Sequence, residues 1–108
     1  MDSETLRTIQ SLIAVGEVRI SEHGYDELAE DGITVTEVVS GAASAEVIED
    51  YPDFPKGSSV LALQTDTAGR PVHVVWGIPK GYTGPAVLVT AYRPDPTRWG
   101  KGFKERLR

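Results

Sequence analysis

The sequence predicts an α+β domain in which two to three N-terminal helices pack on one face of a mainly antiparallel sheet of four to five strands. In the first half of the chain, apolar residues recur at helical spacing between cap residues and glycines. The second half alternates β-prone runs with turn-forming residues. The resulting order of helix, strand, helix, helix and four strands is typical of helices that cover one face of a sheet.

Three segments of the first half combine helical spacing with a cap at the start and a glycine near the end. The third begins with Thr34 and Glu37, which form a capping box. Gly24 weakens the start of the second. The expected helices cover residues 3–15, residues 21–31 and a short segment from residue 34, with strands at residues 18–20 and 46–51.

The stretch from Ser59 to Trp99 reads as two β-hairpins that share a central strand. A four-residue first loop places Ala62 opposite His73, and a symmetric second hairpin places His73 opposite Ala91. The expected strands are residues 60–65, 71–78 and 86–93, joined by residues 66–69 and 79–85.

This register sorts the side chains onto two faces, because strand residues alternate. A bulky apolar face, which we expect the helices to cover, carries Leu61, Leu63, Val72, Val74, Trp76, Ile78, Leu88, Thr90 and Tyr92. The opposite face has smaller residues and gathers Gln64, His73 and Arg93 at one end. That second face is either an open substrate surface or is covered by the C-terminal tail or a partner subunit, with His73 a hydrogen-bonded strand residue.

At 108 residues the chain is expected to form one domain, residues 1–108. Sixteen acidic and eleven basic residues give a net charge of −5, which disfavours nucleic-acid binding by the whole surface. The charge is uneven, because six basic residues follow Tyr92: Arg93, Arg98, Lys101, Lys104, Arg106 and Arg108. This tail is either the contact for a polyanion or a solvated terminus.

The absence of cysteine excludes disulfides and thiolate metal ligands, and two histidines alone argue against a structural zinc site. We therefore expect no metal and no cofactor. A metal-dependent hydrolase that uses Asp50, Asp53 and His73 has no ligand spacing in its support. With no signal peptide and no apolar run that could span a bilayer, we expect a soluble, cytoplasmic protein without membrane contact.

Five short segments, taken in order, carry a family resemblance. They are Ser21-x-His23, Gly32-Ile33-Thr34, residues 47–52, Gly69-Arg70-Pro71-Val72-His73 and residues 90–99 with Arg98-Trp99. Together they resemble the bacterial domain of unknown function 4258 over residues 18–99. The resemblance implies a fold similar to the RelE, BrnT and MqsR toxins, which are ribonucleases of toxin–antitoxin pairs, and the activity follows from it by fold analogy.

The resemblance also implies partners, and the chain differs from the family pattern at two positions. The partners would be RNA and an antitoxin of the zinc-finger or helix-turn-helix type, and a second copy of the chain is a further candidate. Relatives read roughly S-x-H-A-x-x-R-M-x-x-R-G-I, whereas this chain has Glu27 and Asp31 at the two arginine positions. If those arginines face RNA in the relatives, this chain has lost that contact; if they form internal ion pairs, the loss is harmless.

Metal-independent RNA cleavage needs a base for the 2′-hydroxyl, an acid for the 5′-oxygen and cations for the phosphorane charge. We assign His73 as base or acid, with Tyr92 or His23 as the second proton-transfer group. Arg93 and Arg98 would stabilise the phosphate, and Trp99 and Gln64 would contact the substrate. Each has a structural alternative: His23 is a helix-start packing group, Trp99 pins the tail to the core, and Tyr92 projects to the core face.

Three hypotheses follow. The first is a toxin-like, metal-independent endoribonuclease with its site around His73 and Arg93. The second is a catalytically silent relative that binds a partner protein through the same sheet face. The net negative charge of the chain, and the acidic Glu27 and Asp31 at the arginine positions of the family pattern, favour this hypothesis. The third is the metal-dependent hydrolase.

Overall fold

Three helices and a five-stranded sheet make up the computed structural model, which describes residues 2–107. The helical elements are α1 (Glu4–Ala14), α2 (Glu22–Glu30), α3 (Val35–Gly41) and the short 3-10 helix η1 (Ala42–Ser44). The strands are β1 (Val18–Ile20), β2 (Glu46–Tyr51), β3 (Ser59–Thr65), β4 (Pro71–Gly77) and β5 (Ala86–Tyr92).

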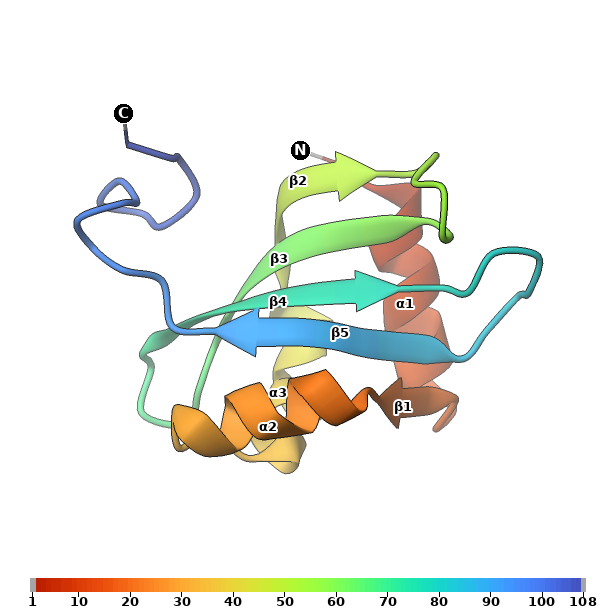
Figure 1. Ribbon diagram of the computed structural model, residues 1–108, viewed down its shortest axis with the longest axis horizontal. Helices are drawn as coiled ribbons and strands as arrows, with labels where there is room; N and C mark the ends of the chain where they lie inside the picture. Colours follow the sequence, from red (N-terminus) through yellow and green to blue (C-terminus); the bar gives the residue numbers. More distant parts are fainter. Residues whose placement is uncertain (1, 108) are drawn as a thin grey trace.

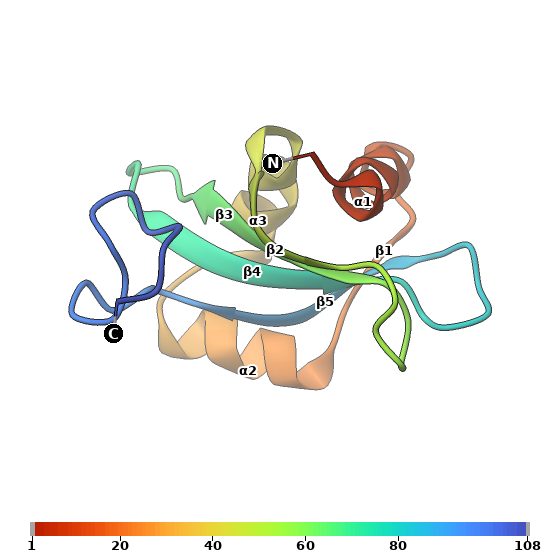
Figure 2. The same ribbon diagram turned by 90° about the horizontal axis from the view of Figure 1, so that it is seen from above.

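The sheet has the order β1-β5-β4-β3-β2, with β1 parallel to β5 and every other pair antiparallel. Helices α1 and α3 cover one face, where Leu6, Ile9 and Val38 pack into the main core (Figure 2). Along one edge of β5 the short strand β1 comes first, and helix α2 follows it and lies beside the rest of β5 (Figure 1). The predicted α+β class and the mainly antiparallel sheet are therefore confirmed.

The predicted register between β3 and β4 is wrong by one residue. Between β4 and β5 it holds next to the loop, where Trp76 lies opposite Leu88, and is wrong by one residue beyond that point. His73 lies opposite Leu63 on β3 and opposite Tyr92 on β5. The first loop spans residues 66–70 rather than 66–69, because Thr65 pairs with Pro71 at the end of the ladder. The β4–β5 register shifts at a β-bulge between Val75 and Trp76, where Val89 of β5 has no partner on β4, and this single shift places His73 opposite Tyr92 instead of Ala91.

This slip exchanges the faces of β3 and of the end of β5, because side chains alternate along a strand. Val60, Ala62 and Ala91, predicted on the open face, are buried in the main core. The side chains of Leu61 and Leu63 belong instead to a second, smaller cluster on the opposite face. We call that opposite face, defined by Leu61, Leu63, His73, Val75 and Tyr92, the tail face.

Gln64 belongs to the main core and not to the site predicted around His73. Its side chain is 3% exposed, accepts a hydrogen bond from Trp76 Nε1 at 2.8 Å and donates to the Val38 carbonyl at 2.8 Å. The interactions join β3, β4 and α3, and they satisfy the polar atoms of two buried side chains. The predicted substrate contact by Gln64 is therefore wrong.

Past the end of β1, two carboxylates, Glu27 of α2 and its C-cap Asp31, accept hydrogen bonds from the unpaired edge of β5. Glu27 Oε1 accepts hydrogen bonds from the Thr90 hydroxyl and from the Ala91 backbone N–H. Asp31 Oδ2 accepts a hydrogen bond from the Arg93 backbone N–H at 3.1 Å. In this chain the two acidic residues therefore satisfy the backbone donors of a strand edge that has no further strand beside it.

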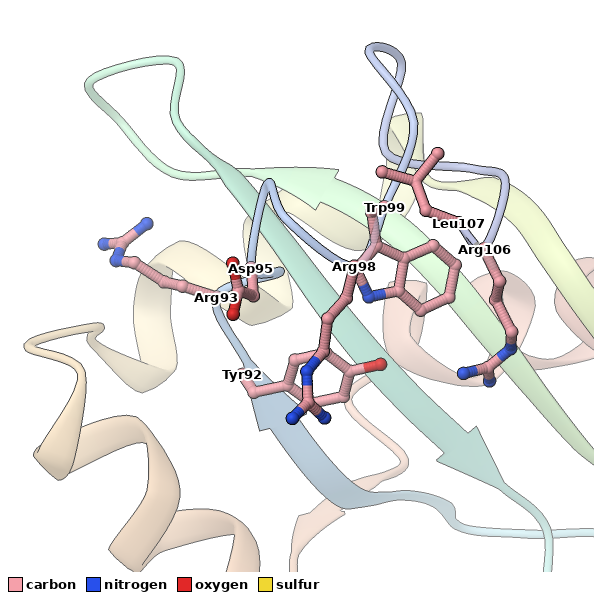
Figure 3. Close-up of a pocket in the computed structure, with 7 residues that line it drawn as sticks. All are labelled: Tyr92, Arg93, Asp95, Arg98, Trp99, Arg106 and Leu107. Atoms are coloured by element: carbon pink, nitrogen blue, oxygen red, sulfur yellow. The ribbon is translucent and has the colours of Figure 1, made fainter.

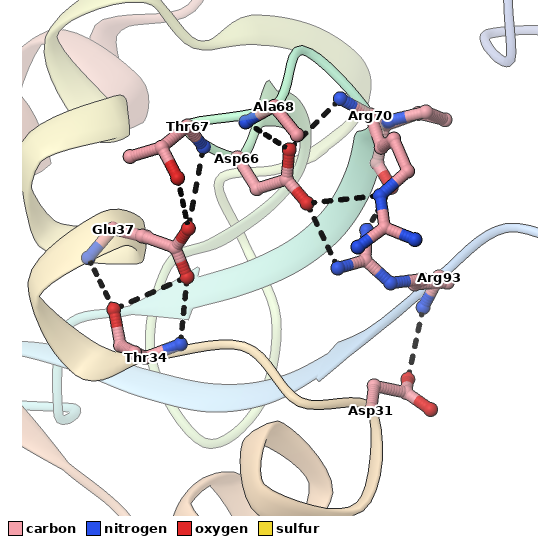
Figure 4. A network of polar contacts seen from close by, with 9 residues as sticks. Asp31, Thr34, Glu37, Asp66, Thr67, Ala68, Arg70 and Arg93 are labelled. Atoms are coloured by element: carbon pink, nitrogen blue, oxygen red, sulfur yellow. Dashed lines mark hydrogen bonds and ion pairs between the residues drawn. The ribbon is translucent and has the colours of Figure 1, made fainter.

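Glu37 holds the β3–β4 turn against the start of α3 (Figure 4). Its side chain completes the predicted capping box with Thr34 and also accepts a 2.6 Å hydrogen bond from the Thr67 hydroxyl. Because these donors stabilise the charged form, with the Thr34 backbone N–H the largest cause, the pKa of Glu37 is lowered to about 2.

We expect Glu27→Arg to lower the free energy of unfolding by about 1–3 kcal/mol, because an arginine cannot accept the Ala91 and Thr90 hydrogen bonds. Urea denaturation measures the change. The matched control is Glu30→Arg, the same substitution at an exposed position of α2. Equal loss in both variants would contradict the role given to Glu27.

We expect the stabilisation from Glu37 to be lost in acid. The folded pKa lies below the ordinary value of 4.5, so the contribution is complete above that value and disappears as the pH falls toward about 2. Urea midpoints of the wild type and Glu37→Gln should differ at neutral pH and converge in acid. Glu22→Gln, in the first turn of α2, is the control. A difference that persists unchanged in acid would refute the assignment.

Candidate functional site

The C-terminal segment, residues 93–107, continues from the end of β5 (Figure 1) and packs against one end of the tail face through Trp99 and Phe103. Trp99 is 5% exposed and packs with Ile48 and Leu61. The Arg106 guanidinium lies over the Trp99 ring, 4.7 Å from its centroid, and pairs with Glu49 of β2 at 2.9 Å. The interpretation that Trp99 pins the tail to the body of the protein is confirmed.

His73 is fully buried beneath this segment. Its Nε2 lies 2.7 Å from the Phe103 carbonyl oxygen, and its Nδ1 lies 3.2 Å from the Tyr92 hydroxyl. A carbonyl can only accept, so Nε2 carries the proton and Nδ1 accepts from Tyr92. Trp99 meets the imidazole edge-on with ring centroids 4.4 Å apart. Burial lowers the pKa of His73, and the neutral ring fits both hydrogen bonds.

Phe103 supplies the carbonyl from a strained backbone. Its φ of 60° lies in the left-handed region, which is unfavourable for a residue with a bulky side chain. The conformation persists because the Phe103 side chain packs into the cluster around Trp99 and the Phe103 carbonyl oxygen accepts from His73. The tail and His73 therefore hold one another in place.

Tyr92 connects the buried histidine to an open pocket. The pocket has a volume of about 430 Å³ and is lined by Tyr92, Arg93, Asp95, Arg98, Trp99, Arg106 and Leu107 (Figure 3). Tyr92 lies beside His73 on the tail face, so its predicted projection to the core face is wrong for the same register reason. Burial raises the pKa of the Tyr92 hydroxyl, which therefore stays protonated at neutral pH.

The three arginines of the pocket differ in how far they are neutralised. Arg93 is directed away from the other two in Figure 3 and forms a 2.8 Å ion pair with Asp66. Arg106 is held by Glu49 through two hydrogen bonds. Arg98 has no ion pair with any of residues 2–107, and it is the cation most available to an anionic ligand.

Asp95 shapes the turn that carries Arg98. Its carboxylate accepts hydrogen bonds from the Thr97 backbone N–H and hydroxyl, each at 2.8 Å. These bonds lower the pKa of Asp95, with the backbone bond the larger cause. The carboxylate is thus committed to the local turn rather than to a proton transfer.

The structure brings together His73, Tyr92, Arg98 and Trp99, and it leaves His23 elsewhere. His23 lies on the exposed surface of α2, where its Nε2 is 3.1 Å from Glu27, and it does not line the pocket. Sequence reasoning missed the specific roles of Glu49, Phe103 and Arg106. The only signal for Arg106 was its place in the basic tail, because its partner Glu49 is far away in sequence.

Among residues 2–107, no group of three or more histidine, cysteine, aspartate or glutamate side chains is arranged to hold a metal ion. None of the helices in the described part of the chain is long and apolar enough to cross a membrane.

A family model described as a domain of unknown function, DUF4258, matches residues 20–93. No curated protein and no solved structure matches the chain. The matched segment contains His73 and Tyr92 and ends at Arg93, so Arg98, Trp99 and Arg106 lie outside it.

We expect the fold to lose stability as the pH falls below the ordinary histidine pKa of 6.5, because the folded pKa of His73 lies below it. The unfolded chain then binds more protons than the folded one. Unfolding free energies measured by urea denaturation across this range check the sign.

The control for this prediction is His23→Gln, which removes the other histidine of the chain and should leave the pH dependence intact. His73→Gln should abolish most of it. Stability that is constant below the ordinary histidine pKa in the wild type would refute the prediction.

Proposed function

Since the chain belongs to the DUF4258 family, whose description states no activity, we propose from the geometry of its own pocket that it is a metal-independent endoribonuclease. The proposal gives this chain the toxin-like role that would follow if the fold of the family is similar to that of the RelE, BrnT and MqsR toxins. An antitoxin protein would then be its partner, and the cytoplasm its place of action.

The observation that supports the proposal most is the hydrogen bond between Tyr92 and His73 at the base of a pocket that also contains Arg98. A phenol oxygen that donates to a buried imidazole keeps its lone pairs for a group in the pocket. An arginine beside it can bind a phosphate through two parallel N–H bonds. Tyr92, as the proton acceptor, and Arg98, as the group that would bind the phosphate, thus line the same pocket.

In the proposed reaction, the RNA 2′-hydroxyl gives its proton to the Tyr92 oxygen while Tyr92 passes its own proton to His73 Nδ1. The 2′-oxygen attacks the phosphorus, and Arg98 stabilises the charge of the phosphorane. The bond to the 5′-oxygen then breaks, and the same two residues return a proton to that oxygen. The products are a 2′,3′-cyclic phosphate and a 5′-hydroxyl, with no net proton released.

His73 acts through Tyr92 in this scheme, because its own nitrogens do not reach the pocket. The Phe103 carbonyl oxygen would stabilise the transient imidazolium by accepting a hydrogen bond from its Nε2–H group. Arg93 has no direct role in the proposed reaction, since it is paired with Asp66.

We expect the purified protein to cleave RNA in the presence of EDTA, and Tyr92→Phe and Arg98→Ala each to slow cleavage by about a hundredfold or more. Gel analysis measures the rate, and mass spectrometry identifies the cyclic phosphate. Lys101→Ala, at an exposed position of the same tail, is the control and should retain the wild-type rate.

Circular dichroism of each variant separates loss of chemistry from loss of folding. Intact RNA after incubation with folded wild-type protein would overturn the proposal. Cleavage that survives in both variants would assign the activity to a contaminant and would overturn it equally.

A second candidate is the catalytically silent module that binds a partner protein. It is favoured by the complete burial of His73, both of whose nitrogens are already bonded within the chain. The absence of cleavage by folded protein would leave this candidate as the better one.

A further inference from the structure

The end of the tail face that the C-terminal segment leaves bare contains an apolar groove. The groove has a volume of about 420 Å³ and shares no residue with the arginine pocket. Its floor is formed by Val75 and Gly77 of β4 and Val87 and Val89 of β5. It lies at the end of the sheet where the β2–β3 and β4–β5 loops meet (Figure 1).

The groove exposes large apolar side chains. Tyr51 is 44% exposed, Phe54 is 48% exposed and Val89 is 42% exposed, and all three line it. These three account for nearly half of the seven large hydrophobic residues that the described chain leaves exposed. Apolar residues gathered in one concave patch mark an interaction surface more often than scattered ones do.

The rim of the groove is basic on a protein that is acidic. Arg19 and Lys56 line it, and none of its lining residues is acidic. Arg19 lies directly beside Val87 in the β1–β5 pairing. Neither cation forms an ion pair with any of residues 2–107, although the chain has sixteen acidic residues. The groove therefore complements a ligand that presents carboxylates beside apolar groups.

The floor of the groove is the face of a sheet and not its edge. The backbone groups of β4 and β5 are already bonded to neighbouring strands, so an extended peptide lying across this face would find no partners for its own backbone. A helix satisfies its backbone internally and buries only side chains, as α1 and α3 do on the opposite face.

We propose that this groove binds an amphipathic helix of a partner protein, with apolar side chains against Val75, Val87 and Val89 and carboxylates facing Arg19 and Lys56. The inference does not depend on RNA cleavage, because the two sites share no residue.

A second copy of the chain is a poor occupant. A two-fold pairing of grooves would bring the Arg19 and Lys56 side chains of both copies into one interface that contains no acidic lining residue. Such a like-charge arrangement is unfavourable, whereas an acidic helix neutralises it.

The test uses two synthetic helical peptides of about fifteen residues with leucines at helical spacing. One carries glutamates on both flanks of the apolar stripe, and the other carries lysines at the same positions. Titration into ¹⁵N-labelled protein is followed by the backbone amide shifts of Gly77, Val87 and Val89. We expect saturable shifts there with the glutamate peptide, and binding at least about tenfold weaker with the lysine peptide.

Two variants and a control locate the binding. Val89→Glu should abolish it, while Val15→Glu, the same change at a residue 73% exposed outside the groove, should not. Arg19→Glu combined with Lys56→Glu should transfer the preference to the lysine peptide.

Several outcomes would overturn the proposal: no shift at millimolar peptide, equal binding of both peptides, or shifts confined to other residues. Concentration-dependent dimerisation in sedimentation velocity that Val89→Glu abolishes would also overturn it, by making a second copy the occupant.

Discussion

The hydrogen bond from the Trp76 indole to Gln64 fixes the register on which the other contacts depend. Trp76 is fully buried, and its N–H needs a partner that the apolar core does not otherwise supply. A slip of one residue between β3 and β4 would turn Gln64 to the opposite face and leave that N–H unsatisfied. The same register places His73 opposite Leu63 under the tail, and the bulge between β4 and β5 then places Tyr92 on its other side.

The burial of His73 is a consequence of that register and of one aromatic side chain. Once His73 faces away from the helices, the tail covers it because Trp99 has an apolar cluster to pack against. The cation above Trp99, Arg106, is held in turn by Glu49 of the edge strand β2. Tyr92 contacts both sides of this arrangement: its hydroxyl is hydrogen-bonded to the buried His73, and its side chain lines the open arginine pocket.

The sequence predicted the helices well, because caps and glycines are local signals. The capping box formed by Thr34 and Glu37 is present as predicted. The register was not predictable to one residue, since it depends on Arg70 belonging to the loop and on a bulge at Val89, opposite Val75 and Trp76, that no residue type announces. Of the residues predicted for the site, His73, Tyr92, Arg98 and Trp99 lie close together in the structure, while Gln64 lies in the main core because of the slip between β3 and β4.

Glu27 and Asp31 illustrate why a family pattern cannot be transferred by residue type alone. Both acids point to the edge of β5, so in this chain these positions are occupied by hydrogen-bond acceptors for a strand. An arginine there has only donors to offer and must be directed elsewhere. A chain with arginines at these positions would therefore need other groups to close the strand edge, in addition to having a different surface charge.

A closed strand edge also bears on how the protein behaves at high concentration. Unpaired N–H and C=O groups at the edge of a sheet are templates for intermolecular strand addition, the first step of many aggregates. On one side of the sheet the carboxylates of Glu27 and Asp31 occupy backbone donors at the end of β5, and the edge strand β1 offers only three residues, Val18–Ile20, to a foreign strand. On the other side, β2 carries Glu46, Glu49 and Asp50 and an irregularity between Val47 and Glu49, both of which oppose the docking of a foreign strand. Both borders of the sheet therefore carry features that oppose the addition of a foreign strand.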